Sequence, residues 1–296
     1  MYNYAEVLDV DESKGLLLTR FVEGNTLTSS NIRAPRVLEE LVRLLHRFHT
    51  EVRFPSPVIF TPLRLAENYR RIITEHFSAD FEPGFLRELE TLFSRTKELD
   101  RILRCMGSPT GGSRPSSHEG ATKISAAFPV LAMHNDVVPS NFIHDGRRLW
   151  MLDFEYCNLG DARYDLANAV VMNDLNAASE DLLQFLYATI HAEHEMRAKI
   201  APLPVDANRL PVPDMTRAER ASQLLMKVLT NLKEGMWGIT QHRVAQQMKF
   251  EASWSAHSSF DVYGRDFLRA AQRALDSEEV IQASAYAQSL CMKEEL

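Results

Sequence analysis

The chain has 296 residues, of which 45% are hydrophobic and 25% charged, a composition typical of a globular protein with a substantial core. Its formal net charge of −7 argues against a protein that binds nucleic acid through a basic surface. No apolar run approaches the roughly 18–20 residues that a membrane span requires, and the first residues lack the basic and apolar segments of a secretory signal.

The first predicted element is a small β hairpin. Strand-like runs at residues 7–10 and 16–21 flank an acidic turn at residues 11–15. A helix is predicted to begin at Pro35, because proline is favoured in the first helical turn and apolar residues then recur at spacings of three and four as far as Phe48.

Further helices are predicted at residues 63–77 and 84–104, which are rich in Leu, Arg and Glu. Residues 107–123 break this pattern, because small, polar, Gly- and Pro-containing residues cannot bury enough surface to offset the entropy of ordering. We predict a disordered surface insertion here, with a linker between two domains as the alternative. From residue 164 the pattern is helical again, apart from a Pro-rich loop at residues 201–214.

A second hairpin is predicted in the middle of the chain, after a short buried strand at residues 130–133. Residues 141–144 and 147–152 are joined by Asp145-Gly146, which is the strongest short signal for a β hairpin. The two strands of a hairpin are antiparallel, so the residues that leave it at its open end lie close in space.

Three oxygen-bearing side chains are therefore expected to converge at this open end: Asp136, Asn141 and Asp153. Such hard ligands suit Mg²⁺, which takes one or two carboxylates together with phosphate and water. A single loop aspartate most often forms a turn. The joint pattern of His134-x-Asp136-x4-Asn141, the hairpin and Leu152-Asp153-Phe154 instead indicates phosphoryl transfer. A metal-dependent hydrolase is the rival enzyme, but it would need further clustered ligands.

Several segments carry a resemblance to one family. Residues 133–142 resemble the catalytic loop of the choline/ethanolamine kinase and aminoglycoside phosphotransferase superfamily, and residues 152–156 resemble the metal-binding segment that follows it. Residues 160–168 are similar to the next segment of that family. Residues 234–241 are similar to the C-terminal segment that supplies a pocket tryptophan. The resemblance covers essentially the whole chain as a C-terminal lobe, apart from residues 107–123.

The resemblance implies an α+β fold: a protein-kinase-like C-terminal lobe, mainly helical, with a small β hairpin at the catalytic loop. Residues 1–24 would be a remnant of the N-terminal lobe, about two strands and a hinge, and residues 25–296 the helical lobe. By analogy, Phe21, Val22 and Glu23 would form the nucleotide hinge. Family members carry a phosphate-covering loop and a strand lysine in the N-terminal lobe, for which only about twenty residues are present here before the hinge.

The resemblance also implies a reaction, the ATP- and Mg²⁺-dependent phosphorylation of a hydroxyl on a small cationic alcohol of the choline or ethanolamine type. Asp136 would position the hydroxyl and accept its proton, and Asn141 and Asp153 would hold Mg²⁺. His134 and Asp165 would support the catalytic loop, with Asp165 anchoring it from the start of a helix.

For substrate binding the resemblance points to Glu155, Tyr156 and Trp237, because a cationic ammonium group binds over aromatic faces beside a carboxylate. Packing in the core is the alternative for Trp237. An acidic pocket built from Glu155 and Asp161 would equally suit an aminoglycoside, so an antibiotic kinase is an alternative function. A non-catalytic, kinase-like binding or regulatory remnant is another, and we expect turnover by this chain near background.

The remaining titratable residues suggest no metal site. His191 and His194 are one turn apart on a helix that is predicted to lie at the surface. Cys105, Cys157 and Cys291 are odd in number and widely spaced, which predicts reduced thiols in a cytoplasmic protein and not a disulfide framework.

Overall fold

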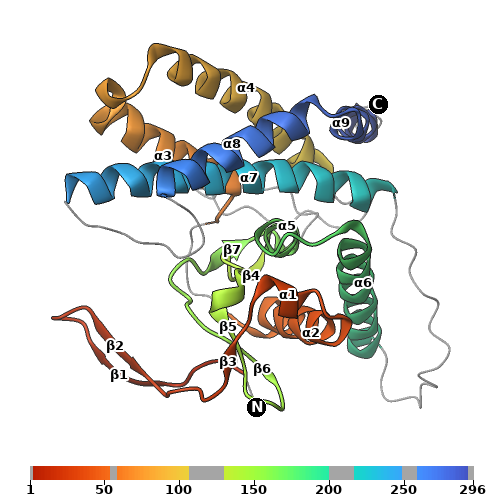
Figure 1. Ribbon diagram of the computed structural model, residues 1–296. Coiled ribbons are helices and arrows are strands. Elements are labelled where there is room, and N and C mark those ends of the chain that lie inside the picture. Colours follow the sequence, from red (N-terminus) through yellow and green to blue (C-terminus); the bar gives the residue numbers. More distant parts are fainter. Residues whose placement is uncertain (1–2, 54–58, 107–129, 200–216, 249–258, 293–296) are drawn as a thin grey trace, which may run out of the picture. The chain divides into compact units, whose positions relative to one another are not determined.

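The structure is a computed structural model, and it describes residues 3–53, 59–106, 130–199, 217–248 and 259–292 (Figure 1). The predicted insertion at residues 107–123 and the Pro-rich loop at residues 201–214 lie outside the described residues.

Contacts within the chain divide it into two compact units. The first unit combines residues 1–58 with 131–215, and the second combines residues 59–130 with 216–296. The boundary predicted at residue 24 stays a prediction.

The first unit begins with the predicted hairpin, formed by β1 (Val7–Asp11) and β2 (Leu16–Thr19) as an antiparallel pair. Every valine and leucine of these two strands is exposed. The segment that follows contains Gly24, at which an added Cβ would lie 2.6 Å from the carbonyl oxygen of His144. Only glycine therefore lets the chain pass this close to the neighbouring strand.

The remaining strands of the first unit form two small sheets. One is antiparallel, in the order β3 (Asn25–Thr26), β5 (Phe142–His144) and β6 (Leu149–Met151). The other pairs β4 (Leu131–Met133) with β7 (Asn158–Gly160). The short strand predicted near residues 130–133 is thus confirmed, and it leads directly into the loop that carries the predicted catalytic residues.

The central hairpin has the predicted position but a longer turn than predicted. Four residues, Asp145 to Arg148, connect β5 to β6, whereas a two-residue Asp-Gly turn was expected. The reason lies in the Asp145 side chain, whose Oδ1 accepts hydrogen bonds from the backbone N–H groups of Arg147 at 2.8 Å and Arg148 at 2.9 Å. Its Oδ2 accepts the indole N–H of Trp150 at 2.7 Å, so one carboxylate organises the whole turn.

Among its described residues, four α-helices complete the first unit: α1 (Ser29–Ile32), α2 (Pro35–Glu51), α5 (Ala162–Met172) and α6 (Ala177–Lys199). The predicted helix start at Pro35 is confirmed, and α2 packs its apolar stripe against α6 and β4. Helix α5 differs from α2, because residues 163–170 are all buried, including charged and amide side chains. Because α5 is buried on all sides, its polar side chains are in a position to bind a neighbouring loop.

In the described part of the second unit, every secondary-structure element longer than one residue is a helix. Its helices are α3 (Pro62–His76), the short 3₁₀ helix η1 (Ser78–Asp80), α4 (Pro83–Met106), α7 (Arg217–Gln247), α8 (Phe260–Asp276) and α9 (Glu278–Met292). The long helix α7 packs against α3, α4, α8 and α9, and Figure 1 shows α8 running beside it. The helices predicted at residues 63–77 and 84–104 are thereby confirmed.

The cysteine prediction was wrong for two of the three residues. Cys105 at the end of α4 and Cys291 near the end of α9 form a disulfide, although 186 residues separate them. The reason is tertiary: α4 packs on α9, which brings the two Cα atoms to 5.8 Å. Cys157 is a free thiol and is buried, as expected.

The described chain is mainly helical with a few short strands, so the predicted fold class is confirmed. Within the described part of residues 1–24, the regular secondary structure consists of the β1–β2 hairpin, as predicted. In the part of the chain that the structure describes, no helix is both long enough and apolar enough to cross a membrane.

Candidate active site

The predicted catalytic residue Asp136 and the predicted metal ligand Asn141 are in direct contact. The side-chain Nδ2 of Asn141 donates one hydrogen bond to Oδ2 of Asp136 at 2.8 Å and another to its backbone carbonyl at 3.0 Å. Both amide hydrogens of Asn141 are therefore engaged, and its oxygen Oδ1 is the atom that remains to face a cation. A short 3₁₀ helix, η2 (Pro139–Asn141), turns the chain so that the five-residue loop closes.

Asp153 lies beside this pair at the open end of the hairpin. The backbone N–H of Leu152 donates to the carbonyl of Asn141 at 2.9 Å, which places the next residue, Asp153, at the same end of the hairpin. Asp153 is exposed and has a φ of +60°. A positive φ at a residue other than glycine costs on the order of 1–3 kcal/mol, and such residues gather at functional sites.

The buried thiol of Cys157 reports how the carboxylates are grouped. The pKa of Cys157 is raised, first by burial and then by the negative charges of Asp165, Asp153 and Asp136. Charges act at this strength only over short distances. The charges of Asp165, Asp153 and Asp136 therefore all act on the Cys157 thiol.

Asp165 anchors the loop through its backbone. The fully buried carboxylate accepts the N–H of His134 through Oδ2 and the N–H of Asn135 through Oδ1, each at 2.8 Å. Asn135 has a φ of +66°, so the residue directly before Asp136 is strained. Burial acts to raise the pKa of Asp165, but hydrogen bonding and the charges of His49 and His134 outweigh it, and the pKa is lowered. The carboxylate is therefore ionised and can only accept hydrogen bonds.

His134 braces the other side of the loop. Its Nε2 donates to the carbonyl of Leu152 at 2.8 Å, next to Asp153. Its ring meets those of Phe142 and Phe154 at centroid distances of 6.1 Å and 5.4 Å. These contacts support the predicted structural role of His134, since they connect the loop of Asp136 to the segment of Asp153.

Three residues that hold the loop were missed by the sequence analysis. Asn168 accepts the N–H of Val137 at 2.6 Å, and Asn173 donates to the carbonyl of Val137 at 2.9 Å. His49, from the distant helix α2, bonds Asp165 at 2.9 Å. A signal was available for the asparagines, because they follow Asp165 at helical spacing in a segment that is otherwise apolar. No local signal distinguished His49.

The histidines of α6 are also placed differently from the prediction. His194 is exposed, as expected of a surface helix, but the rings of both His191 and His194 lie against the buried ring of His46, at centroid distances of 5.6 Å and 5.4 Å. The pKa of His46 is lowered to about 4, mainly by burial and then by the charge of these two neighbours. His46 is therefore neutral at physiological pH.

The predicted substrate residues are divided between the two units. In the first unit Glu155 is exposed, and the carbonyl of Tyr156 accepts the side-chain N–H of Asn135 at 2.8 Å. In the second unit Trp237 of α7 meets the rings of Phe260 and Tyr263 edge-on, at 5.6 Å and 5.8 Å between centroids. Their joint role in binding a substrate stays a prediction.

The predicted hinge is an extended segment between β2 and β3. Phe21 is 84% exposed, Glu23 is exposed and Val22 is partly buried. The role of this segment as a nucleotide hinge stays a prediction.

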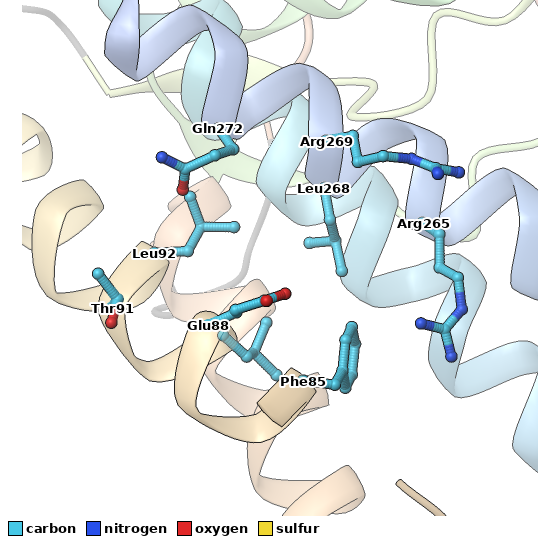
Figure 2. A pocket seen from close by; sticks show the side chains of 9 residues that line it. Phe85, Glu88, Thr91, Leu92, Arg265, Leu268, Arg269 and Gln272 are labelled. Atoms are coloured by element: carbon cyan, nitrogen blue, oxygen red, sulfur yellow. The ribbon is translucent and has the colours of Figure 1, made fainter. Parts of the chain in front are cut away.

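Figure 2 shows a pocket of the second unit, with a volume of about 480 Å³, between α4 and α8. Leu89, Leu268 and Phe85 give it an apolar lining, and the guanidinium of Arg265 lies 4.8 Å from the centre of the Phe85 ring. Arg265 is also paired with a neighbouring aspartate on its own helix. None of the predicted site residues lines this pocket.

The donor atoms at the hairpin fit a magnesium ion bound with a nucleotide. The oxygen of Asn141 and the carboxylate of Asp153 are hard ligands, and Mg²⁺ in proteins commonly takes one or two such groups and completes its shell with phosphate oxygens and water. Among the described residues no cluster of three or more His, Cys, Asp or Glu could hold a metal ion. One amide oxygen and one carboxylate leave the other positions around such an ion to phosphate oxygens and water.

A curated relative matches part of this chain in sequence. Protein LicA from Haemophilus influenzae is 25% identical to this chain over 182 residues, which is 60% of this chain and 57% of that protein. The chain thus matches little more than half of the length of that curated relative.

Comparison with solved structures shows the fold. Choline kinase from Cryptosporidium parvum matches 98% of this chain and 78% of its own, with a TM-score of 0.69 and 13% identity. The structure of LicA in complex with AMP matches 92% of this chain and 72% of its own, with a TM-score of 0.60 and 17% identity. The family model described as "Phosphotransferase enzyme family" matches residues 4–203, more than half of the chain. The chain therefore belongs to the phosphotransferase enzyme family.

Proposed function

We propose that this chain carries the catalytic core of a small-molecule kinase, which transfers the γ-phosphoryl group of ATP to the hydroxyl of a choline- or ethanolamine-like alcohol. The observation that carries the proposal is the hydrogen bond between Asn141 and Asp136 on a strained loop whose backbone is bound by Asp165. Phosphoryl transfer depends almost entirely on positioning and charge, and this loop is held by many bonds.

Each residue has a role that its surroundings support. Asp136 is partly buried and fixed by Asn141, so its carboxylate would orient the attacking hydroxyl and take its proton late in the transfer. Asn141 and Asp153 would hold Mg²⁺, which when bound neutralises charge on the phosphates. The remaining residues act on the loop: Asp165 fixes the backbone before Asp136, and His134 fixes the carbonyl before Asp153.

A cationic alcohol is supported by two features. The carboxylates around Cys157 make this part of the first unit acidic, which favours a cation over an anion. LicA in complex with AMP and a choline kinase share the fold, and their names connect it with a nucleotide and with choline. In the first unit Glu155 and Tyr156 would contact the ammonium group, an interaction worth about 0.5–2 kcal/mol for an aromatic face.

The test is a measurement of ADP release, and of phosphorylated product by ³¹P NMR, with Mg²⁺, ATP and separate acceptors: choline, ethanolamine and an aminoglycoside. High protein concentration is used, because weak turnover is expected. We expect product with choline or ethanolamine. Product only with the aminoglycoside would support the antibiotic kinase, and acceptor binding without any ADP release would support the non-catalytic alternative.

The decisive variant is Asp136→Asn, which keeps the volume of the side chain and removes its ability to take a proton. We expect it to lower kcat by about 10²–10⁴-fold, the range for loss of a general base. Asp174→Asn is the matched control, since Asp174 is 93% exposed and pairs with Arg33 at the surface. Turnover that survives Asp136→Asn would contradict the role given to Asp136.

A further inference from the structure

A continuous chain of hydrogen bonds leads from helix α6 to the loop of Asp136. The hydroxyl of Tyr187 lies 2.8 Å from Nδ1 of His49, and Nε2 of His49 lies 2.9 Å from Oδ2 of Asp165. Asp165 in turn holds the backbone of His134 and Asn135. The side chains of His49 and Asp165 therefore connect Tyr187 to Asn135.

The direction of each hydrogen in this chain follows from the ionised carboxylate. Asp165 can only accept, so Nε2 of His49 must carry the hydrogen that lies between them. If the imidazole is neutral, Nδ1 of His49 then carries no hydrogen and is an acceptor. A buried acceptor of this kind requires a hydrogen-bond donor. The hydroxyl of Tyr187 is the group in reach. Burial, followed by the charges of Asp165 and Asp161, raises the pKa of Tyr187, so the hydroxyl keeps its proton.

The other titratable groups around Tyr187 do not compete for this role. The ring of Tyr187 lies 5.4 Å from that of His46 and is stacked 6.4 Å from that of His191. Nε2 of His46 faces Nδ1 of His191 at 3.4 Å, so these two imidazoles bond each other, and His46 is neutral. The His49 ring itself lies edge-on to Tyr187 at 5.7 Å.

We propose that Tyr187 is a positioning residue of the phosphotransfer site: it donates to Nδ1 of His49 and so holds His49 in the tautomer that donates to Asp165. The other tautomer would place a lone pair of Nε2 against the carboxylate, which would push Asp165 away from the N–H groups of His134 and Asn135. Asn135 has a positive φ and needs those bonds to stay in place. The catalytic part of this inference rests on the proposed function; the structural part does not.

The test compares the wild-type chain with Tyr187→Phe, which removes one oxygen and keeps the ring. Long-range ¹H–¹⁵N correlation spectra identify the tautomer of His49. We expect the wild type to show hydrogen on Nε2 and a hydrogen-bonded Nδ1. In Tyr187→Phe we expect a second tautomer, and exchange of the His134 and Asn135 amide hydrogens that is about tenfold faster, as the loss of one buried hydrogen bond predicts.

The kinetic measurement on the same proteins is ADP release. We expect kcat of Tyr187→Phe to fall about tenfold while KM for ATP is nearly unchanged, because the loop of Asp136 moves and the metal ligands stay. The matched control is Thr189→Val on the same helix, since the Thr189 hydroxyl donates to the carbonyl of Phe185 within α6 at 2.8 Å. We expect this control to leave all three measurements unchanged.

Two results would overturn the inference. One is a wild-type spectrum with hydrogen on Nδ1 of His49, in a neutral or a doubly protonated ring, and this result needs no variant to be folded. The other is Tyr187→Phe with an unchanged tautomer, unchanged amide exchange or unchanged kcat. Absence of turnover in the wild type would contradict the proposed function alone, because the spectra and the amide exchange would still decide whether Tyr187 positions the loop.

Discussion

In the first unit a fully buried carboxylate, Asp165, binds the backbone of a loop, whereas in the second unit two helices approach through glycines. A Cβ added at Gly238 of α7 would lie 2.6 Å from Cδ1 of Tyr263 and 2.8 Å from Cα of Gly264, both on α8. The two units therefore use different means. Hydrogen bonds from Asp165 fix the direction of peptide groups, while close packing at Gly238 fixes only the distance between helices.

This difference fits the roles of the two units. A loop that presents Asp136 needs its peptide groups held in fixed orientations, and a buried ionised group can hold them. Stability falls strongly when one partner of such a group is removed. A helical scaffold needs no such directional control. Substitutions in the two units should therefore lower the free energy of unfolding by different amounts. The pH dependence of these losses should also differ.

The largest effect is expected for Asp165→Asn. The variant keeps the size of the side chain but loses the charge. Its NH₂ group replaces one carboxylate oxygen, so it faces either the N–H of Asn135 or the N–H groups of His134 and His49. We expect the free energy of unfolding near pH 7 to fall by about 3–5 kcal/mol, the range for breaking a buried charged pair. Urea denaturation measures this loss.

The sign of the pH dependence follows from the lowered pKa of Asp165. Its contribution to stability is fully present above the ordinary value of 3.8 and is lost as the pH falls through the lower value of the folded state. The difference between wild type and Asp165→Asn should thus narrow below about pH 4. A difference that stays constant down to the acid transition would show that Asp165 does not act through its charge.

A smaller effect is expected for Gly238→Ala in the second unit. The added methyl group would push against backbone and ring atoms of α8, and overpacking of this kind costs about 1–3 kcal/mol. Urea denaturation should show this loss with no dependence on pH. Gly84→Ala in α4 is the control, since nothing lies within 4 Å of an added Cβ there, and its stability should be unchanged or slightly higher.

The smallest effect concerns the turn of the β5–β6 hairpin. The pKa of Asp145 is lowered to about 2, first by the hydrogen bond from Trp150 and then by the backbone N–H groups of Arg148 and Arg147. Its stabilising bonds are therefore present above its ordinary value of 3.8 and are lost only as the pH falls toward 2. The NMR signal of the Trp150 indole N–H should stay constant from pH 6 to pH 4. A midpoint near pH 4 would show that the carboxylate does not accept this bond.

Much of the local structure was determined by the sequence alone. Pro35 with its apolar spacing predicted α2, and Asp145-Gly146 predicted the hairpin that brings Asn141 to the same end as Leu152 and Asp153. These predictions succeeded because turn chemistry and helical periodicity act over a few residues. The predicted length of the turn was wrong. The Asp-Gly pair by itself does not show how many backbone N–H groups the Asp145 side chain binds, and these bonds set the length of the turn.

Only the tertiary structure decided which distant side chains reach the loop. His49 of α2 meets Asp165 of α5 across 116 positions. Tyr187 meets His49 across 138 positions, because α2 packs against α6. The disulfide between Cys105 and Cys291 depends in the same way on the packing of α4 against α9. Hydrophobic patterns show which face of a helix is buried, but they do not show which face of another helix it will meet. The partners of a buried polar group are therefore set by the packing of whole helices.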